Sequence, residues 1–478
     1  MRFLKKHWYT VSLFVIFCLG VGLRVWSMSS HELFFGDQVR DAKVVLDIPT
    51  NTPFLGPISS AGNYFLPPVY FYLMYVFSLG FKSVNWLYSF SFVCGIALLP
   101  IWYVFFDEML PQSKHKKTLL LSAFLYITIN TNEINDGSTI WNPNTLNFWF
   151  LSSLLLANNI HKSPKNWSVL LLGLCLSIFS QLHTGVLPVV ALLFLITVKG
   201  LYVQKQWIKI CLLCASFSFL YTPYLLYEIT HGFGNTVGLV KSFAGHGIKN
   251  ALLGRLYQLA QSSNLIFSQV YTKFDIGIVL AIFPLVFYLY LGYKLYHKNF
   301  ILKLSVASWA IFLFFIVGFH GKLEIFHLKI LWFAPIVLAI AFLSTDTNQK
   351  WIKYVCSVFI IITLSANIYS NIDFFTNKFS QNRVANYADI VDITNRLPDN
   401  SHYCETESQT MSQKKSVQFI VEFEHQKNLV LVDTCNQSNY TIISKYRTKF
   451  GIGTDKNTPP NNIKIIAENQ GVYLGAML

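Results

Sequence analysis

Long apolar runs separated by short polar segments make up the first 371 residues of the chain. A run of about 17 or more apolar residues is long enough to cross a bilayer as a helix. These runs predict eleven membrane-spanning helices, near residues 8–27, 84–106, 118–132, 144–160, 167–181, 186–204, 207–227, 275–297, 303–320, 324–343 and 353–371. No small-residue cleavage site follows the first run, so we expect it to stay as a span and not to be removed as a signal peptide.

The segment 67–81, PPVYFYLMYVFSLGF, decides the predicted topology. It is short for a span, it begins with two prolines, and it ends near a glycine, as a short helix would. If it does not cross, six basic clusters fall on the same side as the N-terminus, which the positive-inside rule makes cytoplasmic. These clusters are residues 2–7, 114–117, 161–165, 199–209, 294–303 and 348–353. If it crossed, five of the six would face outward, so we predict a helix in the outer interface with Tyr70, Tyr72 and Tyr75 at the headgroup level.

This topology places the long polar segments outside a cell membrane. They are the first outer loop (28–83), a short loop (132–143), a turn (181–185), a second long loop (228–274) and the C-terminal region (372–478). In the C-terminal region, residues 382–397 read as a helix, and 427–434 and 439–446 read as strands. The expected fold is therefore an α-helical polytopic membrane domain with juxtamembrane helices (1–371), followed by a small extracytoplasmic α/β domain (372–478).

Composition supports the membrane class and limits the partners. Hydrophobic residues make up 53% of the chain and charged residues 13%, whereas soluble domains carry about 25% charged residues. The net charge of +14 lies largely in the clusters between apolar runs, so it indicates orientation and no nucleic-acid partner. Cys404 and Cys435 are the two cysteines in polar sequence, and outside the membrane they can form a disulfide.

Residues 34–42, FFGDQVRDA, carry the most suggestive charges. In a helix that begins at Gly36, Asp37, Arg40 and Asp41 share one face because they are spaced i, i+3, i+4. Val39, Ala42 and either Val45 or Leu46 then line the opposite face, and Pro49 ends the helix. On spacing alone, a solvated face with an Asp37–Arg40 pair that anchors the loop fits equally well.

The whole first outer loop, FFGDQVRDAKVVLD followed by FLGPISSAGNYFLPPVYFYLMYVFSLGF, resembles that of the GT-C glycosyltransferases. The nearest resemblance is to the protein O-mannosyltransferases and aminoarabinose transferases. In that family an acidic residue follows the first span, an arginine lies a few positions later, and a Pro-Pro-aromatic juxtamembrane helix closes the loop. The segments 138–150, 180–188 and 221–236 resemble the next three outer loops, and the C-terminal region matches much less.

The resemblance implies transfer of a sugar from a polyprenyl-phosphate donor to an acceptor at the outer membrane face, with inversion. Carried over by position, Asp37 is the general base that takes the acceptor's proton. Arg40 contacts the carrier phosphate and stabilises the charge that develops on it. Further candidates are His183, Arg255 and Lys322 for the phosphate, and Asp41, Tyr64, Trp141 and Asn142 for the substrate.

One departure from the family pattern bears on metal use. Asn142 precedes Pro143 where relatives often have an acidic residue, so a paired-carboxylate or metal-bridged mechanism is not expected, and neither is a required cofactor or divalent metal. Glu133 and Asp136 are nearby acids that we expect to be solvated. His183 fits a helix cap as well as it fits a phosphate contact, and the polar stretch 320–327 fits a turn between spans slightly better than a donor site.

Two other functions stay open at this stage. A glycan polymerase or ligase also uses polyprenyl-linked substrates, but commonly relies on arginines and a histidine in large late loops. A lipid or glycolipid flippase is the second alternative, although the spans hold almost no mid-span ionisable residues of the kind that ion-coupled transporters use. The expected partners are a polyprenyl-phosphate-linked sugar, a lipid, glycan or protein acceptor, and membrane lipids; the sugar and the carrier length are not specified by the sequence.

Overall fold

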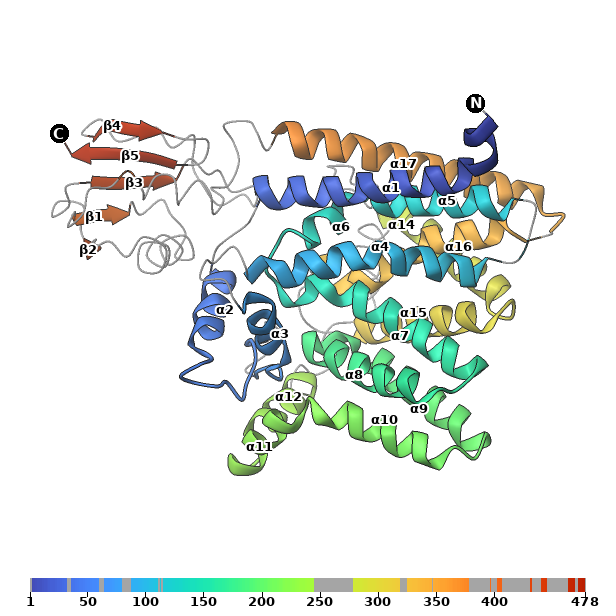
Figure 1. Cartoon of the computed structure of the whole chain (residues 1–478), viewed down its shortest axis with the longest axis horizontal. Coiled ribbons are helices and arrows are strands. Elements are labelled where there is room, and N and C mark those ends of the chain that lie inside the picture. The colour runs from blue at the N-terminus through green and yellow to red at the C-terminus, as the bar shows by residue number, and fades with distance from the viewer. Residues whose placement is uncertain are drawn as a thin grey trace.

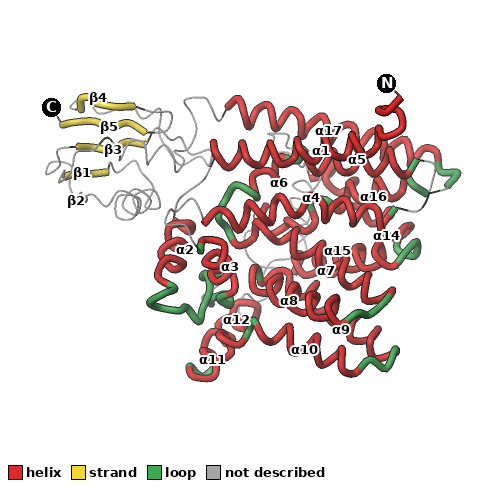
Figure 2. The backbone as a smooth tube through the Cα atoms, in the orientation of Figure 1, coloured by secondary structure: helices red, strands yellow, loops and turns green. Residues whose placement is uncertain are grey.

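The computed structural model describes residues 2–377 apart from 32–35, 60–63, 80–86, 111, 113–114, 245–277, 319–324 and 346, and beyond them residue 396 and five strands. The part up to residue 377 is helical, and the strands all come from the C-terminal region (Figures 1 and 2).

Eleven helices of the described part lie at the eleven predicted spans. They are α1 (Arg2–His31), α4 (Ser89–Met109), α5 (Lys116–Thr128), α7 (Leu146–Lys162), α8 (Asn166–Leu182), α9 (Leu187–Val203), α10 (Trp207–Phe219), α14 (Ile278–Leu295), α15 (Phe300–Gly318), α16 (Ala334–Leu343) and α17 (Lys350–Asn377). Shorter elements lie between them: α2 (Gly36–Asp47), α3 (Val69–Ser78), α6 (Thr131–Asp136), α11 (Thr222–Thr230), α12 (Gly234–Ala244), and the 3-10 helices η2 (Asn142–Thr145), η3 (Thr184–Val186) and η4 (Ile325–Leu331).

Fewer of these helices are long enough to cross a membrane than the sequence predicts. Among the described residues, four candidate spans have sufficient length and hydropathy: His7–Met28, Ser89–Met109, Thr184–Val203 and Lys350–Tyr369. A fifth is counted if α10 and α11, which meet at a 65° bend, form one span. The count of eleven is therefore not confirmed.

Two of the predicted spans are interrupted, and local chemistry explains the first interruption. Pro223 stands in the first turn of α11, where proline starts a helix well but cannot continue one, so the run 207–227 bends. The run 324–343 begins as the 3-10 helix η4 and becomes α-helical only at Ala334. Within the segment 67–81, α3 has ten residues, which is too short to cross a bilayer.

The basic connectors between helices gather at one end of the bundle, which we call the connector end (Figure 1). There the His161 ring stacks on Phe300 with centroids 3.7 Å apart, and Lys209 Nζ donates to the Pro164 carbonyl at 2.6 Å. The helices α2, α3, α6, α11 and α12 lie at the opposite end, the loop end (Figure 1). This common placement agrees with the predicted topology, and the positive-inside rule predicts that the connector end is cytoplasmic.

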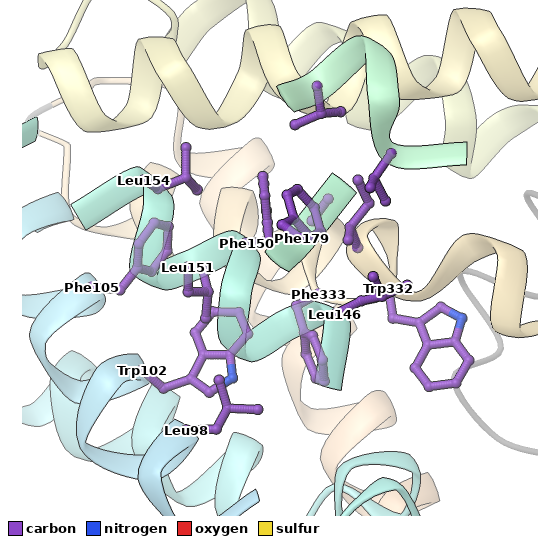
Figure 3. Packing of buried hydrophobic residues seen from close by; sticks show 14 of the residues in the cluster. Leu98, Trp102, Phe105, Leu146, Phe150, Leu151, Leu154, Phe179, Trp332 and Phe333 are labelled. Atoms are coloured by element: carbon purple, nitrogen blue, oxygen red, sulfur yellow. The ribbon is translucent and has the colours of Figure 1, made fainter. Parts of the chain in front are cut away.

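An apolar core packs the helices of the bundle against one another (Figure 3). Trp102 of α4 lies edge-on to Phe333, just before α16, with centroids 5.0 Å apart. Phe150 of α7 packs on Phe179 of α8 at 6.0 Å. All nine residues from Ala334 to Phe342 are buried, so α16 lies inside the bundle. The loops therefore start from a packed frame.

The C-terminal strands form one sheet of order β2-β1-β3-β5-β4. Its strands are β1 (His402–Glu405), β2 (Val430–Leu431), β3 (Tyr440–Ser444), β4 (Ile463–Glu468) and β5 (Val472–Met477). β1 pairs in parallel with β2 and β3, and β5 pairs antiparallel with β3 and β4. β2 and β3 fall within the two predicted strand segments. The predicted helix lies outside the described residues except for residue 396, and so does Cys435, so the disulfide stays a prediction.

Close packing of α8 on α10 generates a stability prediction. A Cβ added to Gly173 would lie 1.9 Å from Ser216 Oγ and 2.9 Å from the Leu213 carbonyl oxygen, whereas one added to Gly200 would meet nothing within 4 Å. We expect Gly173→Ala to cost about 1–3 kcal/mol through overpacking, with Gly200→Ala neutral as the matched control. Thermal unfolding of both variants in detergent measures the difference, and equal melting temperatures would contradict the packing.

The topology generates a second prediction. Asn51, at the loop end, and Gln112, at the connector end, are both exposed. We expect a membrane-impermeant maleimide to label Asn51→Cys in intact cells above the parental background, and to label Gln112→Cys only after permeabilisation. Labelling of Gln112→Cys in intact cells would invert the map.

Candidate active site

The helix α2 forms where the sequence predicts it, from Gly36 to Asp47. Val39, Ala42 and Val45 are all buried, and α2 packs on α3. The buried face of α2 therefore fixes the direction in which its charged side chains leave the helix.

Arg40 lies between two carboxylates. Its Nε and Nη2 lie 2.8 Å and 2.7 Å from Asp41 Oδ1, and its Nη1 lies 3.0 Å from Asp37 Oδ1. The Asp37 side chain is 55% exposed and that of Arg40 36%, but the Asp41 side chain is fully buried. The three charges thus share a face as predicted, yet only Asp37 and Arg40 reach the surface.

Burial sets the electrostatics of Asp41. It raises the pKa of the Asp41 carboxyl to about 7, against the opposing effect of Arg40. The neighbouring Tyr70 hydroxyl of α3 is also buried, and burial followed by the charge of Asp41 raises its pKa. Among the described residues, neither Asp41 Oδ2 nor the Tyr70 hydroxyl has a hydrogen-bond partner. Tyr70, expected at the headgroup level, is therefore a buried neighbour of the charged site.

The second outer loop is held beside α2 and the third loop by side-chain amides. Gln38 Nε2 donates to the Ile140 carbonyl at 3.0 Å, and Asn142 Nδ2 donates to the Leu182 carbonyl at 2.5 Å. Asn142 is buried, whereas Trp141 between the two tethers is partly exposed. The loop thus fixes the backbone position of Trp141, and the side chain of Asn142 serves as a tether.

Tyr64 joins the first loop to the third. Its ring is 1% exposed and its hydroxyl lies 2.9 Å from Thr184 Oγ1, so it is an anchor and not an exposed stacking surface. The adjacent His183 accepts a hydrogen bond at Nδ1 from the Gly185 backbone N–H at 3.0 Å. His183 therefore caps η3, one of the two roles that the sequence allows.

Asn235 joins the first loop to α12, and sequence reasoning missed it. Its Oδ1 accepts from the Phe65 backbone N–H at 2.6 Å. Its Nδ2 donates to the Phe65 carbonyl and to the Tyr224 hydroxyl, each at 2.9 Å. One amide thus satisfies both backbone groups of Phe65, as a neighbouring strand would. No local pattern marks this residue, because its partner is 170 positions away.

A buried cluster of charged and amide side chains holds the second outer loop in place. Lys329 Nζ donates to Asp136 Oδ1 at 2.6 Å and to Asn144 Oδ1 at 2.5 Å. Asn147 Nδ2 donates to Glu133 Oε1 at 2.6 Å. Glu133 and Lys329 are each 2% exposed, and burial, followed by the charge of Asp136, raises the pKa of Glu133.

The expectation that Glu133 and Asp136 are solvated is wrong. The short helix α6 turns these residues inward, and Asn130 caps it by accepting from the Asn132 and Glu133 backbone N–H groups. The compensating cation, Lys329, comes from a distant segment and was not visible from the local sequence. From the local sequence alone, acidic residues in a loop next to an apolar span are predicted to be exposed. Their burial becomes apparent only when the tertiary partner is known.

Two of the sequence candidates, Arg255 and Lys322, lie outside the described residues. Within the described part of the chain, no group of three or more His, Cys, Asp and Glu side chains is arranged to hold a metal ion. The expectation that no divalent metal is required stays a prediction.

The buried cluster generates a double-mutant prediction. Removing one partner of a buried ion pair leaves an uncompensated charge and costs about 3–5 kcal/mol, so we expect Lys329→Met to lower thermal stability strongly. Lys329→Met with Asp136→Asn should recover most of the loss. The control is Lys162→Met, which breaks the exposed pair with Glu108 and should cost at most about 1 kcal/mol. A double variant no more stable than Lys329→Met would contradict the pairing.

Comparison with known proteins gives structural neighbours only. No family model matches the chain, and no curated protein matches it. It is similar to the crystal structure of ArnT from Cupriavidus metallidurans in the apo state, with 12% identity, a TM-score of 0.49, and coverage of 99% of this chain and 98% of that chain. It is also similar to ArnT from the same organism bound to undecaprenyl phosphate, with 10% identity, a TM-score of 0.44, and 97% coverage of each chain.

ArnT is an aminoarabinose transferase of the GT-C glycosyltransferases. At these identities and scores, neither neighbour assigns a substrate or a site residue to this chain.

Proposed function

We propose that this chain is a membrane glycosyltransferase that moves a sugar from a polyprenyl-phosphate donor to an acceptor at the outer membrane face. The observation that carries the proposal is the pairing on α2 of an exposed carboxylate, Asp37, with a partly exposed arginine, Arg40. Both lie at the loop end, away from the basic connectors, in a loop whose sequence resembles that of GT-C enzymes.

Asp37 acts as the general base. Its carboxylate accepts the proton of the acceptor hydroxyl while the acceptor oxygen bonds to the anomeric carbon of the sugar. The bond from that carbon to the phosphate oxygen breaks, and its electron pair leaves with the polyprenyl phosphate. Attack opposite the leaving group inverts the anomeric centre.

Arg40 binds the phosphate of the donor. A guanidinium presents several N–H donors in a plane and matches phosphate oxygens better than an ammonium does. Negative charge grows on the phosphate as the bond to the sugar breaks, so an arginine contact stabilises the transition state more than the ground state. Because the phosphate is a good leaving group, the reaction needs no separate general acid.

Trp141 is the aromatic residue best placed for a contact with the sugar. It is partly exposed, and the tethers from Gln38 and Asn142 hold the backbone on either side of it. An aromatic face can stack on the apolar face of a sugar ring. Asn142 remains a candidate through its carbonyl oxygen, since its amide nitrogen is used in the tether.

Substitution of Asp37 tests the assignment. We expect Asp37→Asn to lower kcat about 100-fold or more through loss of the base, and Arg40→Ala to lower kcat/KM for the donor with partial recovery in Arg40→Lys. The assay measures transfer from polyprenyl-phosphate-linked mannose, glucose and aminoarabinose in membrane vesicles that retain native acceptors.

Asp47→Asn is the matched control, because Asp47 is an exposed aspartate on the same helix whose carboxylate accepts from the Thr50 hydroxyl. It should retain transfer within about twofold, as surface substitutions usually have small effects. If Asp37→Asn inserts, folds and transfers sugar as fast as Asp47→Asn, Asp37 is not the base.

A further inference from the structure

The two edges of the Arg40 guanidinium are in different surroundings. The inner edge, Nε and Nη2, contacts a fully buried carboxylate, Asp41. The outer edge, through Nη1, contacts the exposed carboxylate of Asp37. A contact with a buried group is screened little by water, whereas an exposed ion pair is worth at most about 1 kcal/mol. The outer contact is therefore the one that an incoming anion can replace.

The outer contact also occupies the proposed base. The Asp37 oxygen that accepts from Nη1 cannot use the same lone pair to accept a proton from a hydroxyl. Because the ion pair competes with the acceptor for one of the two Asp37 oxygens, the base is less available before a donor is bound. A donor phosphate offers Arg40 several anionic oxygens for charge-assisted hydrogen bonds and so competes with Asp37 for the guanidinium.

We propose that Arg40 occupies Asp37 in the donor-free enzyme and that the donor phosphate releases this base by taking over Nη1. Asp41 is the positioning residue that holds the inner edge of Arg40 during the exchange. This inference rests on the proposed function. It favours an order of binding in which the donor binds first and Asp37, released from Arg40, then accepts the proton of the acceptor.

The surroundings of Asp41 suit a fixed inner anchor. The charged and titratable groups that act on it are Arg40 and Asp37 from α2 and the Tyr70 hydroxyl from α3. Asp41 Oδ2 and the Tyr70 hydroxyl are buried without a partner among the described residues. While Asp41 Oδ1 holds the inner edge of Arg40, the Tyr70 hydroxyl is the buried group of α3 that is available to compensate the rest of this carboxylate.

The anchor should weaken in acid. The pKa of Asp41 is raised to about 7 by burial, so Asp41 is ionised above pH 7 and loses its charge as the pH falls through that value. A neutral Asp41 holds the guanidinium less firmly, so the donor should bind more weakly at pH 6 than at pH 8. The raised pKa also means that Asp41 alone favours the folded state more at low pH than at high pH, so weaker donor binding in acid does not reflect unfolding at this site.

The test is Asp41→Asn in the full chain, with donor KM and kcat measured from pH 6 to pH 8. We expect the donor KM to rise about tenfold at pH 8, as for loss of one charge-assisted hydrogen bond, with kcat within about threefold. The wild-type increase in KM from pH 8 to pH 6 should be absent in Asp41→Asn. A purely structural role would lower the active fraction, and therefore kcat, without moving KM or its pH dependence, and that result would overturn the proposal.

A second variant and a second probe cover the other outcomes. Tyr70→Phe removes only a buried hydroxyl and should raise the donor KM in the same direction; an unchanged KM in both variants would also overturn the proposal. Polyprenyl phosphate without a sugar should bind the wild type and inhibit competitively with the donor. If the wild type binds this lipid and transfers sugar but Asp41→Asn has a normal donor KM, the exchange at Arg40 is disproved and the proposed glycosyltransferase function stands. Wild-type protein that does neither disproves the glycosyltransferase function as well.

Discussion

The interaction on which the site depends is the contact of one guanidinium with two carboxylates of opposite burial. Burying an ionised Asp41 is costly unless a cation compensates it, and Arg40 supplies that charge from the next position of the helix. The same requirement keeps Arg40 from extending fully into solvent. Asp37, one turn earlier, completes the pairing at the surface. The buried carboxylate of Asp41 thus sets the direction of the Arg40 side chain. That direction in turn places Nη1 in contact with the exposed carboxylate of Asp37.

The loops around this helix are held mainly by side-chain amides and hydroxyls bound to backbone groups or to each other. Gln38, Asn142 and Asn235 each satisfy backbone groups of a loop that comes from another part of the chain. Tyr64 and Thr184 connect the first and third loops directly. Such contacts satisfy irregular backbone at the end of an apolar bundle, and they place one partly exposed aromatic residue, Trp141, at a fixed point between loops. The buried Lys329–Asp136 pair also holds the second outer loop in place.

Much of the framework could be predicted from local sequence. The bounds of α2, its buried face and its three charges follow from helical spacing, and the grouping of the basic connectors follows from the positive-inside rule. The burial of Asp41 does not follow, because Asp37 and Asp41 lie on the same helical face and helical spacing does not show which of them the tertiary fold covers. The burial of Glu133 and Asp136 depends on Lys329, nearly 200 positions away, and the role of Asn235 depends on Phe65. Long-range pairings of this kind leave no periodic pattern in a single sequence. The number of spans is not confirmed either, since hydrophobic runs do not reveal where a helix bends or becomes a 3-10 helix.

The exchange of Arg40 from Asp37 to the donor phosphate is tested most directly by the position of the Arg40 guanidinium. Cryo-EM structures of the full chain, determined with and without polyprenyl phosphate, would show that position. Without the lipid, Nη1 should lie about 3 Å from Asp37 Oδ1, as it does here. With the lipid bound, Nη1 should contact a phosphate oxygen, its contact with Asp37 should be broken, and the inner edge should stay on Asp41. A bound phosphate that leaves the Arg40–Asp37 pair intact would contradict the account.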